Sequence, residues 1–188
     1  MASPLYKKII IPEEEVNARI DELAKQIIEK YKDKNPLFVC LLHGGLPFAS
    51  KLLFSIVRQK PDFHPTLDTM IVSTYGDSRT GKHSRIVTDL SPKTKVENRS
   101  VIILDDVLDE GHTAEYTKKH VLDAGASDAI LVVLVTKDKK RQKYPEAEMY
   151  GFKAPDVWLT GMGMDDAALA TDGNRWMSSI AIANGIED

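Results

Sequence analysis

Apolar residues recur at steps of three and four between positions 13 and 34 of the chain. The repeat consists of Val16, Ile20, Leu23, Ile27 and Tyr31. This period is typical of an amphipathic helix whose apolar stripe faces a core. Glutamates crowd its first turn and lysines its last, as the helix dipole favours. We therefore expect a helix that begins after Pro12 and ends before Asn35.

Other apolar residues form continuous runs, which are typical of strands covered on both faces. The predicted strands cover residues 37–42, 67–74, 100–104 and 128–136. Two further helices are expected between these strands, over residues 48–58 and 113–124. Strands that alternate with helices predict an α/β fold with a doubly wound, mostly parallel sheet flanked by helices.

Three regions lack so clear a period. Residues 75–85 contain several turn formers, so we expect a mobile excursion there. The first 11 residues predict a strand rather than an export signal, because only a short apolar run follows their basic pair. From Lys143 onward the pattern is irregular, with short strand candidates at 157–160 and 179–182.

Composition narrows the class of protein. The chain has 188 residues, 43% of them hydrophobic, and a net charge of -3 from 25 basic and 28 acidic side chains. This predicts one domain over residues 1–188, with a small lobe built from the N-terminal segment and the C-terminal third. The weak acidity argues against a nucleic-acid partner, with the basic cluster at 137–143 as the main exception. No apolar run is long enough to span a bilayer, so we expect no membrane contact and a cytoplasmic location.

The densest chemistry lies between Val101 and Thr113. An apolar run is followed by three aspartates within five positions, and Gly111 and Thr113 then lead into a predicted helix. Ligands of parallel sheets gather at the carboxyl ends of the strands, and a helix N-terminus suits a phosphate group. Carboxylates can accept hydrogen bonds from ribose hydroxyls, so the segment predicts a sugar-phosphate site. Acidic turn residues that merely cap the helix are the alternative.

The same segment resembles the PRPP signature of the phosphoribosyltransferases. That signature is an apolar strand, two acids, two apolar residues, Asp, a small residue, Gly, any residue and Thr. The chain places at these positions Asp105, Asp106, Val107, Leu108, Asp109, Glu110, Gly111, His112 and Thr113. Further landmarks follow in the family's order at residues 42–45, 73–76, 137, 155–161 and 165. The whole chain is similar to the hypoxanthine-guanine phosphoribosyltransferases.

The resemblance implies a purine salvage enzyme. It would transfer the 5-phosphoribosyl group of PRPP to hypoxanthine, and to guanine, giving IMP or GMP and pyrophosphate. The cofactor would be Mg²⁺, held with the help of Asp105, Asp106 and Asp165. The implied partners are these small molecules and further copies of the chain, in a homodimer or homotetramer. Which 6-oxopurine is preferred, xanthine included, is left open by the sequence.

On the sugar side, the resemblance assigns Asp105 and Asp106 to the ribose hydroxyls. Asp109 would be catalytic, as the acceptor or orienting group for the purine N7 proton. The remaining signature residues would form the 5-phosphate cradle: Glu110, Gly111, His112 and Thr113. Glu110 replaces a small residue, and we expect its side chain to point outward, because a carboxylate would repel a phosphate.

Two other loops are implied at the pyrophosphate. Leu42, His43 and Gly44 match the family's pyrophosphate loop, in which a non-proline cis peptide would join Leu42 to His43. Arg175 is the candidate for the family's pyrophosphate arginine, although it lies four residues beyond the usual position. Thr74 and Tyr75 match the hood that closes over PRPP and excludes water.

At the base, Lys137 would donate to the purine O6 and so select oxo over amino purines. Trp158 would stack on the ring, and Leu159 would offer its backbone carbonyl near the 2-position. Asp165 would lie near a second magnesium, unless the register shifts to Asp166. A surface lysine and a core tryptophan are the plain alternatives for Lys137 and Trp158.

Two rival functions stay open at this point. One is a regulatory protein of the same fold that senses PRPP or a purine and binds nucleic acid. The other is a response-regulator-like α/β domain that binds magnesium through an acid cluster. The net charge disfavours the first, and the Gly-x-Thr turn after the acids disfavours the second.

Overall fold

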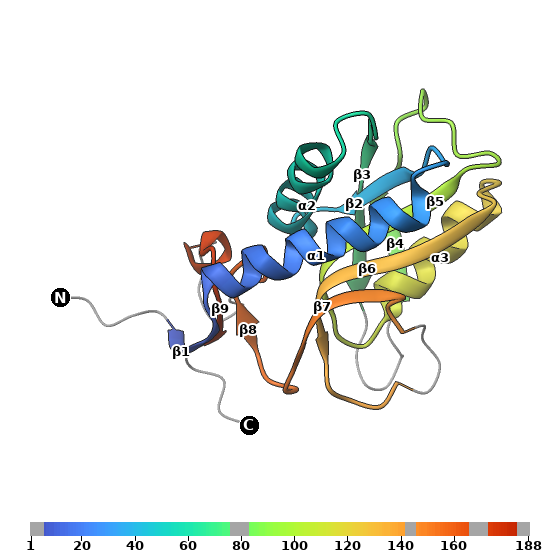
Figure 1. Cartoon of the computed structure of the whole chain (residues 1–188). Helices are drawn as coiled ribbons and strands as arrows, with labels where there is room; N and C mark the ends of the chain where they lie inside the picture. Colours follow the sequence, from blue (N-terminus) through green and yellow to red (C-terminus); the bar gives the residue numbers. More distant parts are fainter. Residues whose placement is uncertain (1–5, 76–82, 142–145, 166–172, 184–188) are drawn as a thin grey trace.

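The computed structural model describes residues 6–75, 83–141, 146–165 and 173–183. Its main sheet has six strands in the order β4-β3-β2-β5-β6-β7 (Figure 1). Their bounds are Leu37–Leu41 (β2), Thr66–Tyr75 (β3), His83–Thr88 (β4), Ser100–Leu108 (β5), Asp128–Lys137 (β6) and Met149–Ala154 (β7). All neighbours are parallel except β3 and β4. The predicted mostly parallel α/β sheet is confirmed.

Three helices cover the two faces of this sheet. Their bounds are Glu13–Tyr31 (α1), Gly45–Gln59 (α2) and His112–Asp123 (α3). Alternate residues of β5 separate the two cores, as expected for a strand buried on both faces. Ile102 and Leu104 pack with α1 and α2, whereas Val101 and Ile103 pack with α3. The apolar stripe predicted for α1 is buried along its whole length.

A second, three-stranded antiparallel sheet joins the two ends of the described chain. Its order is β1-β9-β8, with bounds Tyr6–Ile11 (β1), Leu159–Thr160 (β8) and Ile180–Ala183 (β9). A short 3-10 turn, η1 (Gly173–Trp176), precedes β9. This sheet stands beside the carboxyl end of the main sheet (Figure 1). It therefore brings the C-terminal third close to the ends of β5 and β6.

Three boundaries differ from the sequence prediction. The pattern after Lys143 was expected to be irregular apart from two short strands, but β7 forms there as an edge strand. Only Gly151 and Ala154 of β7 are buried, so this strand shows no continuous apolar run. The expected excursion overlaps the first residues of β4, while residues 76–82 lie outside the described part. β5 continues past Leu104 to Leu108, so the two adjacent acids lie within the strand.

Two smaller expectations concern the whole molecule. Cys40 is buried within β2, and this burial raises the pKa of its thiol to about 12. A thiol in this state is a small apolar core group rather than a nucleophile. None of the described helices combines the length and apolarity that a membrane crossing requires.

Candidate functional site

The end of β5 holds two adjacent carboxylates. The amide of Asp106 donates to Asp105 Oδ1 at 3.0 Å, and the amide of Val107 donates to Asp106 Oδ1 at 2.8 Å. Burial raises the pKa of both carboxyls, and repulsion from Asp106 raises that of Asp105 further. Both groups therefore carry an electrostatic cost that a cation or a hydrogen-bond donor would relieve.

A first cavity of about 170 Å³ opens where β5 passes into α3. Most of the predicted sugar-phosphate residues line it, together with Thr74 of β3: Asp105, Asp109, Glu110, Gly111, His112 and Thr113. Gly111 adopts φ 85°, a left-handed conformation that allows the sharp turn into α3. The hydroxyls of Thr74 and Thr113 hydrogen-bond at 3.0 Å across the cavity rim. An anion here would meet the N-terminus of α3.

A second cavity of about 140 Å³ lies beside the first. Its lining combines β5, β6 and the small sheet: Asp106, Val107, Asp109, Lys137, Trp158, Leu159, Met164 and Asp165. The four residues predicted to contact a purine are thus brought together. Lys137 is only 10% exposed, and Trp158 is 38% exposed. Neither a plain surface lysine nor a core tryptophan describes them.

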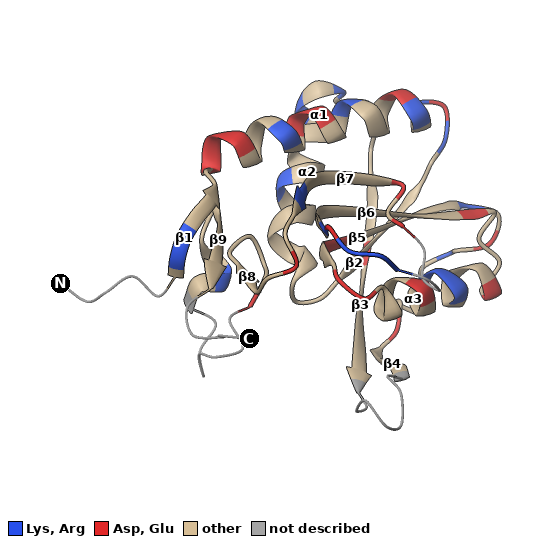
Figure 2. Ribbon diagram, turned by 90° about the horizontal axis from the view of Figure 1, so that it is seen from below, with Lys and Arg blue, Asp and Glu red and all other residues tan. Residues whose placement is uncertain are grey.

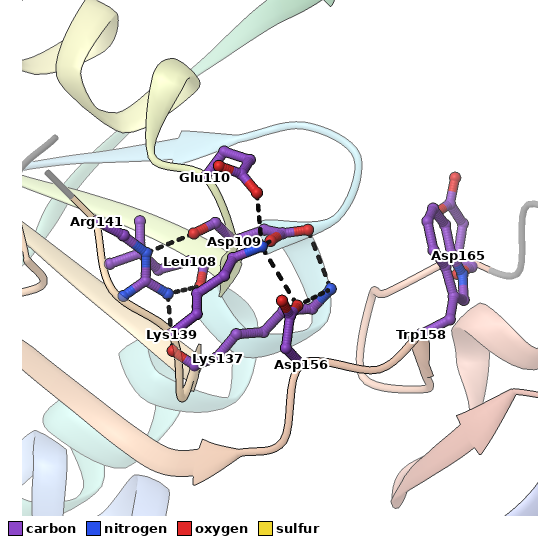
Figure 3. A network of polar contacts seen from close by, with 9 residues as sticks. All are labelled: Leu108, Asp109, Glu110, Lys137, Lys139, Arg141, Asp156, Trp158 and Asp165. Carbon is purple, nitrogen blue, oxygen red and sulfur yellow. Dashed lines mark hydrogen bonds and ion pairs between the residues drawn. The ribbon is translucent and has the colours of Figure 1, made fainter. Parts of the chain in front are cut away.

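Asp109 lies between the cavities in a network of opposite charges (Figure 3). Lys137 Nζ lies 3.0 Å from Asp109 Oδ2 and 3.5 Å from Asp156 Oδ1. Lys139 Nζ pairs with Asp109 Oδ1, with Glu110 at 2.7 Å and with Asp156 at 3.3 Å. Burial opposes ionisation of Asp109, but the two ammonium groups outweigh it and hold its pKa below the ordinary value.

Three members of this network were not among the predicted site residues. In the sequence, Lys139 and Arg141 lie in a basic run that suits a solvated surface, and Asp156 follows a proline. Arg141 donates to the backbone carbonyls of Leu108 and Lys137 at 2.6 and 2.9 Å, and also to that of Asp109. The basic segment after β6 is thereby fixed against the acidic end of β5 (Figure 2). The excess of lysines in this run was the only sequence signal.

Residues 42–44 lie on the other side of Asp106. The peptide bond between Leu42 and His43 is cis, as the resemblance implied. A Cβ atom at Gly44 would lie 2.3 Å from Asp106 Oδ2, so any other residue there would displace the Asp106 carboxylate. Gly163, at φ 104°, approaches so closely that its Cβ would lie 1.7 Å from the Gly44 carbonyl oxygen. The loop is therefore held between β5 and the turn that carries Asp165.

Arg175 of η1 reaches the same place. Its guanidinium lies 3.1 Å from Asp165 Oδ2 and donates to the Gly163 carbonyl at 2.6 Å. Its charge also offsets part of the rise in the pKa of Asp106. Asp166 falls outside the described residues. The Tyr75 backbone pairs with His83 at the end of β3.

A preformed metal centre is not part of this arrangement. No group of three His, Cys, Asp or Glu side chains among the described residues could by itself hold an ion. Asp165 is paired with Arg175, which leaves Asp105 and Asp106 as the two adjacent acids of the site. Two carboxylates suit Mg²⁺, which usually retains waters and binds substrate phosphates as further ligands.

Comparison with known proteins gives a consistent result. The family of the phosphoribosyl transferase domain matches residues 10–167. The chain is 33% identical to the hypoxanthine-guanine phosphoribosyltransferase of Bacillus subtilis over 162 residues, 86% of each chain. A crystal structure of a hypoxanthine phosphoribosyltransferase from Staphylococcus aureus superposes with a TM-score of 0.84 at 28% identity. That superposition covers 96% of this chain and 92% of the other.

Proposed function

The chain belongs to the phosphoribosyl transferase domain family, and on that premise we propose that it transfers the 5-phosphoribosyl group of PRPP to hypoxanthine or guanine. One observation carries the proposal: Asp109 lines both cavities. A sugar phosphate in one and a base in the other would meet at this carboxylate. Joining them is the reaction of a phosphoribosyltransferase.

The second cavity suits a 6-oxopurine. Lys137 offers N–H donors and no acceptor, so it pairs with a 6-oxo group and not with the amino group of adenine. The indole of Trp158 is held by a hydrogen bond from its Nε1 to the Asp165 carbonyl at 2.9 Å. The purine would stack on that ring while Asp109 accepts the hydrogen bond from N7–H. Proton loss toward Asp109 would make the attacking purine nitrogen more nucleophilic.

The first cavity suits the ribose 5-phosphate. The amides at the start of α3 and the Thr113 hydroxyl would bind the phosphate, and Asp105 and Asp106 the ribose hydroxyls. Glu110 pairs with Lys139, so its charge is offset beside this anion. Pyrophosphate would leave along the backbone of residues 42–44, with Arg175 as its cation.

Mg²⁺ fits the two carboxylates of β5. Their pKa values are raised by burial and mutual repulsion, so a divalent ion would stabilise their charged forms. We propose that the ion arrives with PRPP, held by Asp105, Asp106 and the substrate, with Asp165 close by. Bound there, it would offset the charge that develops on the departing pyrophosphate.

We further propose a cytoplasmic enzyme that acts as a homodimer or homotetramer. Phe54 and Val57 of α2 are 74% and 42% exposed, which gives copies of the chain an apolar surface to share. The nucleic-acid-binding alternative draws no support from the structure. Lys137 and Lys139 of the basic run that suggested it are paired with Asp109, Glu110 and Asp156.

The test is a rate comparison with four bases. With PRPP and Mg²⁺, we expect pyrophosphate release with hypoxanthine and guanine and none above background with adenine. Xanthine reports whether the pocket accepts a 2-oxo group. Consumption of adenine in preference to the oxopurines, or no release with any base, would overturn the proposal. Titration with DNA and RNA at physiological salt supplies the control for the regulatory alternative.

A further inference from the structure

Two lysines and two aspartates alternate in the network around Asp109. Lys137 and Lys139 each contact both Asp109 and Asp156, so either carboxylate has two cations (Figure 3). Lys139 adds Glu110 as a third partner and is 18% exposed. Two ammonium groups are thus shared among three carboxylates, so the acids depend on whichever lysine stays when the other turns away.

Lys137 and Lys139 differ in whether they line the base cavity. Among the described residues that line the base cavity are Lys137 and Trp158, but not Lys139. Lys137 Nζ also lies 5.9 Å from the centre of the Trp158 ring. Both lysines line a separate hollow with Arg141 and Tyr150, but Lys139, which follows β6, lines no described part of the base cavity. Only Lys137 can therefore reach a ligand in the base cavity without rearrangement of the loop.

A ligand that takes Lys137 must remove it from its present partners. The ammonium group has three N–H donors, and two now face Asp109 and Asp156. Turning toward a purine oxygen weakens these contacts. Asp109 Oδ2 then loses its contact with Lys137, while the buried Oδ1 keeps Lys139 as its cation. A partly buried carboxylate left without any cation is costly. A second cation that stays in place removes this cost.

We propose that Lys139 is a positioning residue that keeps Asp109 and Asp156 neutralised while Lys137 turns to the 6-oxo group of the purine. The inference rests on the proposed function and deepens it. Lys139 does not touch the substrate. It sets how readily Lys137 is released toward the base.

Loss of Lys139 should then weaken base use specifically. In Lys139→Gln, Lys137 becomes the sole cation for two carboxylates and is held there. We expect kcat/KM for hypoxanthine to fall about tenfold, the effect of losing one favourable charged contact, with the KM for PRPP little changed. Lys139→Arg retains the charge and should restore most of the activity. Lys140→Gln, at the exposed neighbouring position, is the matched control and should behave as the parent.

A double-mutant cycle separates positioning from a structural role. IMP binding is measured by calorimetry for the parent, Lys137→Gln, Lys139→Gln and the double variant, with thermal unfolding as the check on folding. Because Lys139 acts through Lys137, the Lys139 substitution should have no further effect once Lys137 is absent. Equal effects of Lys139→Gln in both backgrounds would overturn the inference. Lys139→Met replaces Lys139→Gln if the latter unfolds.

The outcomes for the inference and for the proposed function are distinct. A parent protein that binds no IMP and consumes no PRPP would overturn the proposed function and the inference with it. A parent that binds IMP, with Lys139→Gln binding it equally well, would overturn the inference alone.

Discussion

Two sets of carboxylates lie three residues apart along the chain and have opposite electrostatics. Asp105 and Asp106, inside β5, have raised pKa values because they are buried next to each other. Asp109, in the turn after β5, has a lowered pKa because two lysines from β6 and its following loop face it. The same residue type thus occupies a cation-poor and a cation-rich place in one site.

The two sets differ in how far protein groups already offset their negative charge. The charge at Asp105 and Asp106 is offset only in part by protein groups, which favours a bound ion or donor from outside. The charge at Asp109 is already balanced, so this group is ionised before any base arrives. Asp105 and Asp106 are therefore suited to binding a cation or donor, and Asp109 is suited to accepting a hydrogen bond as soon as a base binds.

The strongest test of this contrast is Asp109→Asn. The amide cannot take a proton from the base, so turnover should fall by a factor on the order of 10²–10⁴, the usual range for lost acid–base help. PRPP binding should persist, because the other cradle groups remain. Steady-state rates and PRPP titration measure the two effects, and normal turnover would remove Asp109 from the chemistry.

Lys137→Ala removes one of the two cations and the donor to O6. We expect base use to fall by about 10- to 100-fold, as for a lost charged hydrogen bond, with a smaller change for PRPP. Separate KM values for base and PRPP check this. Equal losses for both substrates would show that Lys137 serves the network as a whole rather than the base.

Asp105→Asn tests the cation-poor set through stability. A carboxyl whose folded pKa is raised holds its proton more tightly when folded. Its stabilising contribution is therefore present below the ordinary pKa of 3.8 and is lost as pH rises through the folded value. The substitution should raise the free energy of unfolding at neutral pH by about 1 kcal/mol and leave it little changed in acid. Thermal melts across pH measure this, while PRPP use should decline.

Asp68 offers a carboxylate outside the site for comparison. It accepts hydrogen bonds from the amides of Thr69 and Ser91 at 2.7 and 2.8 Å and from the Thr94 hydroxyl at 2.5 Å. Burial alone would raise its pKa, but these donors outweigh it and lower the value. Its stabilisation is thus present above the ordinary pKa of 3.8 and disappears as pH falls through the folded value.

Asp68→Asn should therefore cost about 1 kcal/mol of stability at neutral pH, with the difference shrinking in acid and the turnover unchanged. Denaturant unfolding at two pH values measures it. A pH trend like that of Asp105→Asn would show that the two sets do not differ as described.

The parts of the site formed by residues close together in the sequence could be predicted from it. The run from Asp105 to Thr113 contains its strand, turn and helix start within a few residues, so its chemistry could be inferred directly. The placement of Lys137 and Trp158 relied on resemblance to a family. Their common cavity depends on the small sheet, whose strands come from both ends of the described chain.

What could not be predicted depends on tertiary contacts. Lys139 and Asp156 meet only because β7 lies parallel to β6. The segments that follow the two strands therefore leave the sheet at the same end. β7 itself was missed because only Gly151 and Ala154 of this strand are buried, so it lacks the continuous apolar signal of the central strands. The extension of β5 through Asp105 and Asp106 was missed because acids are unfavourable in isolated strands.

The contact between Gly163 and the Gly44 carbonyl has an implication for engineering. Residue 163 supplies no side chain to the site, yet any side chain there would push two loops apart. A saturation scan should therefore score this position as intolerant as the acids. Loop grafting from relatives would have to exchange both glycine turns as one unit, since neither can be redesigned alone.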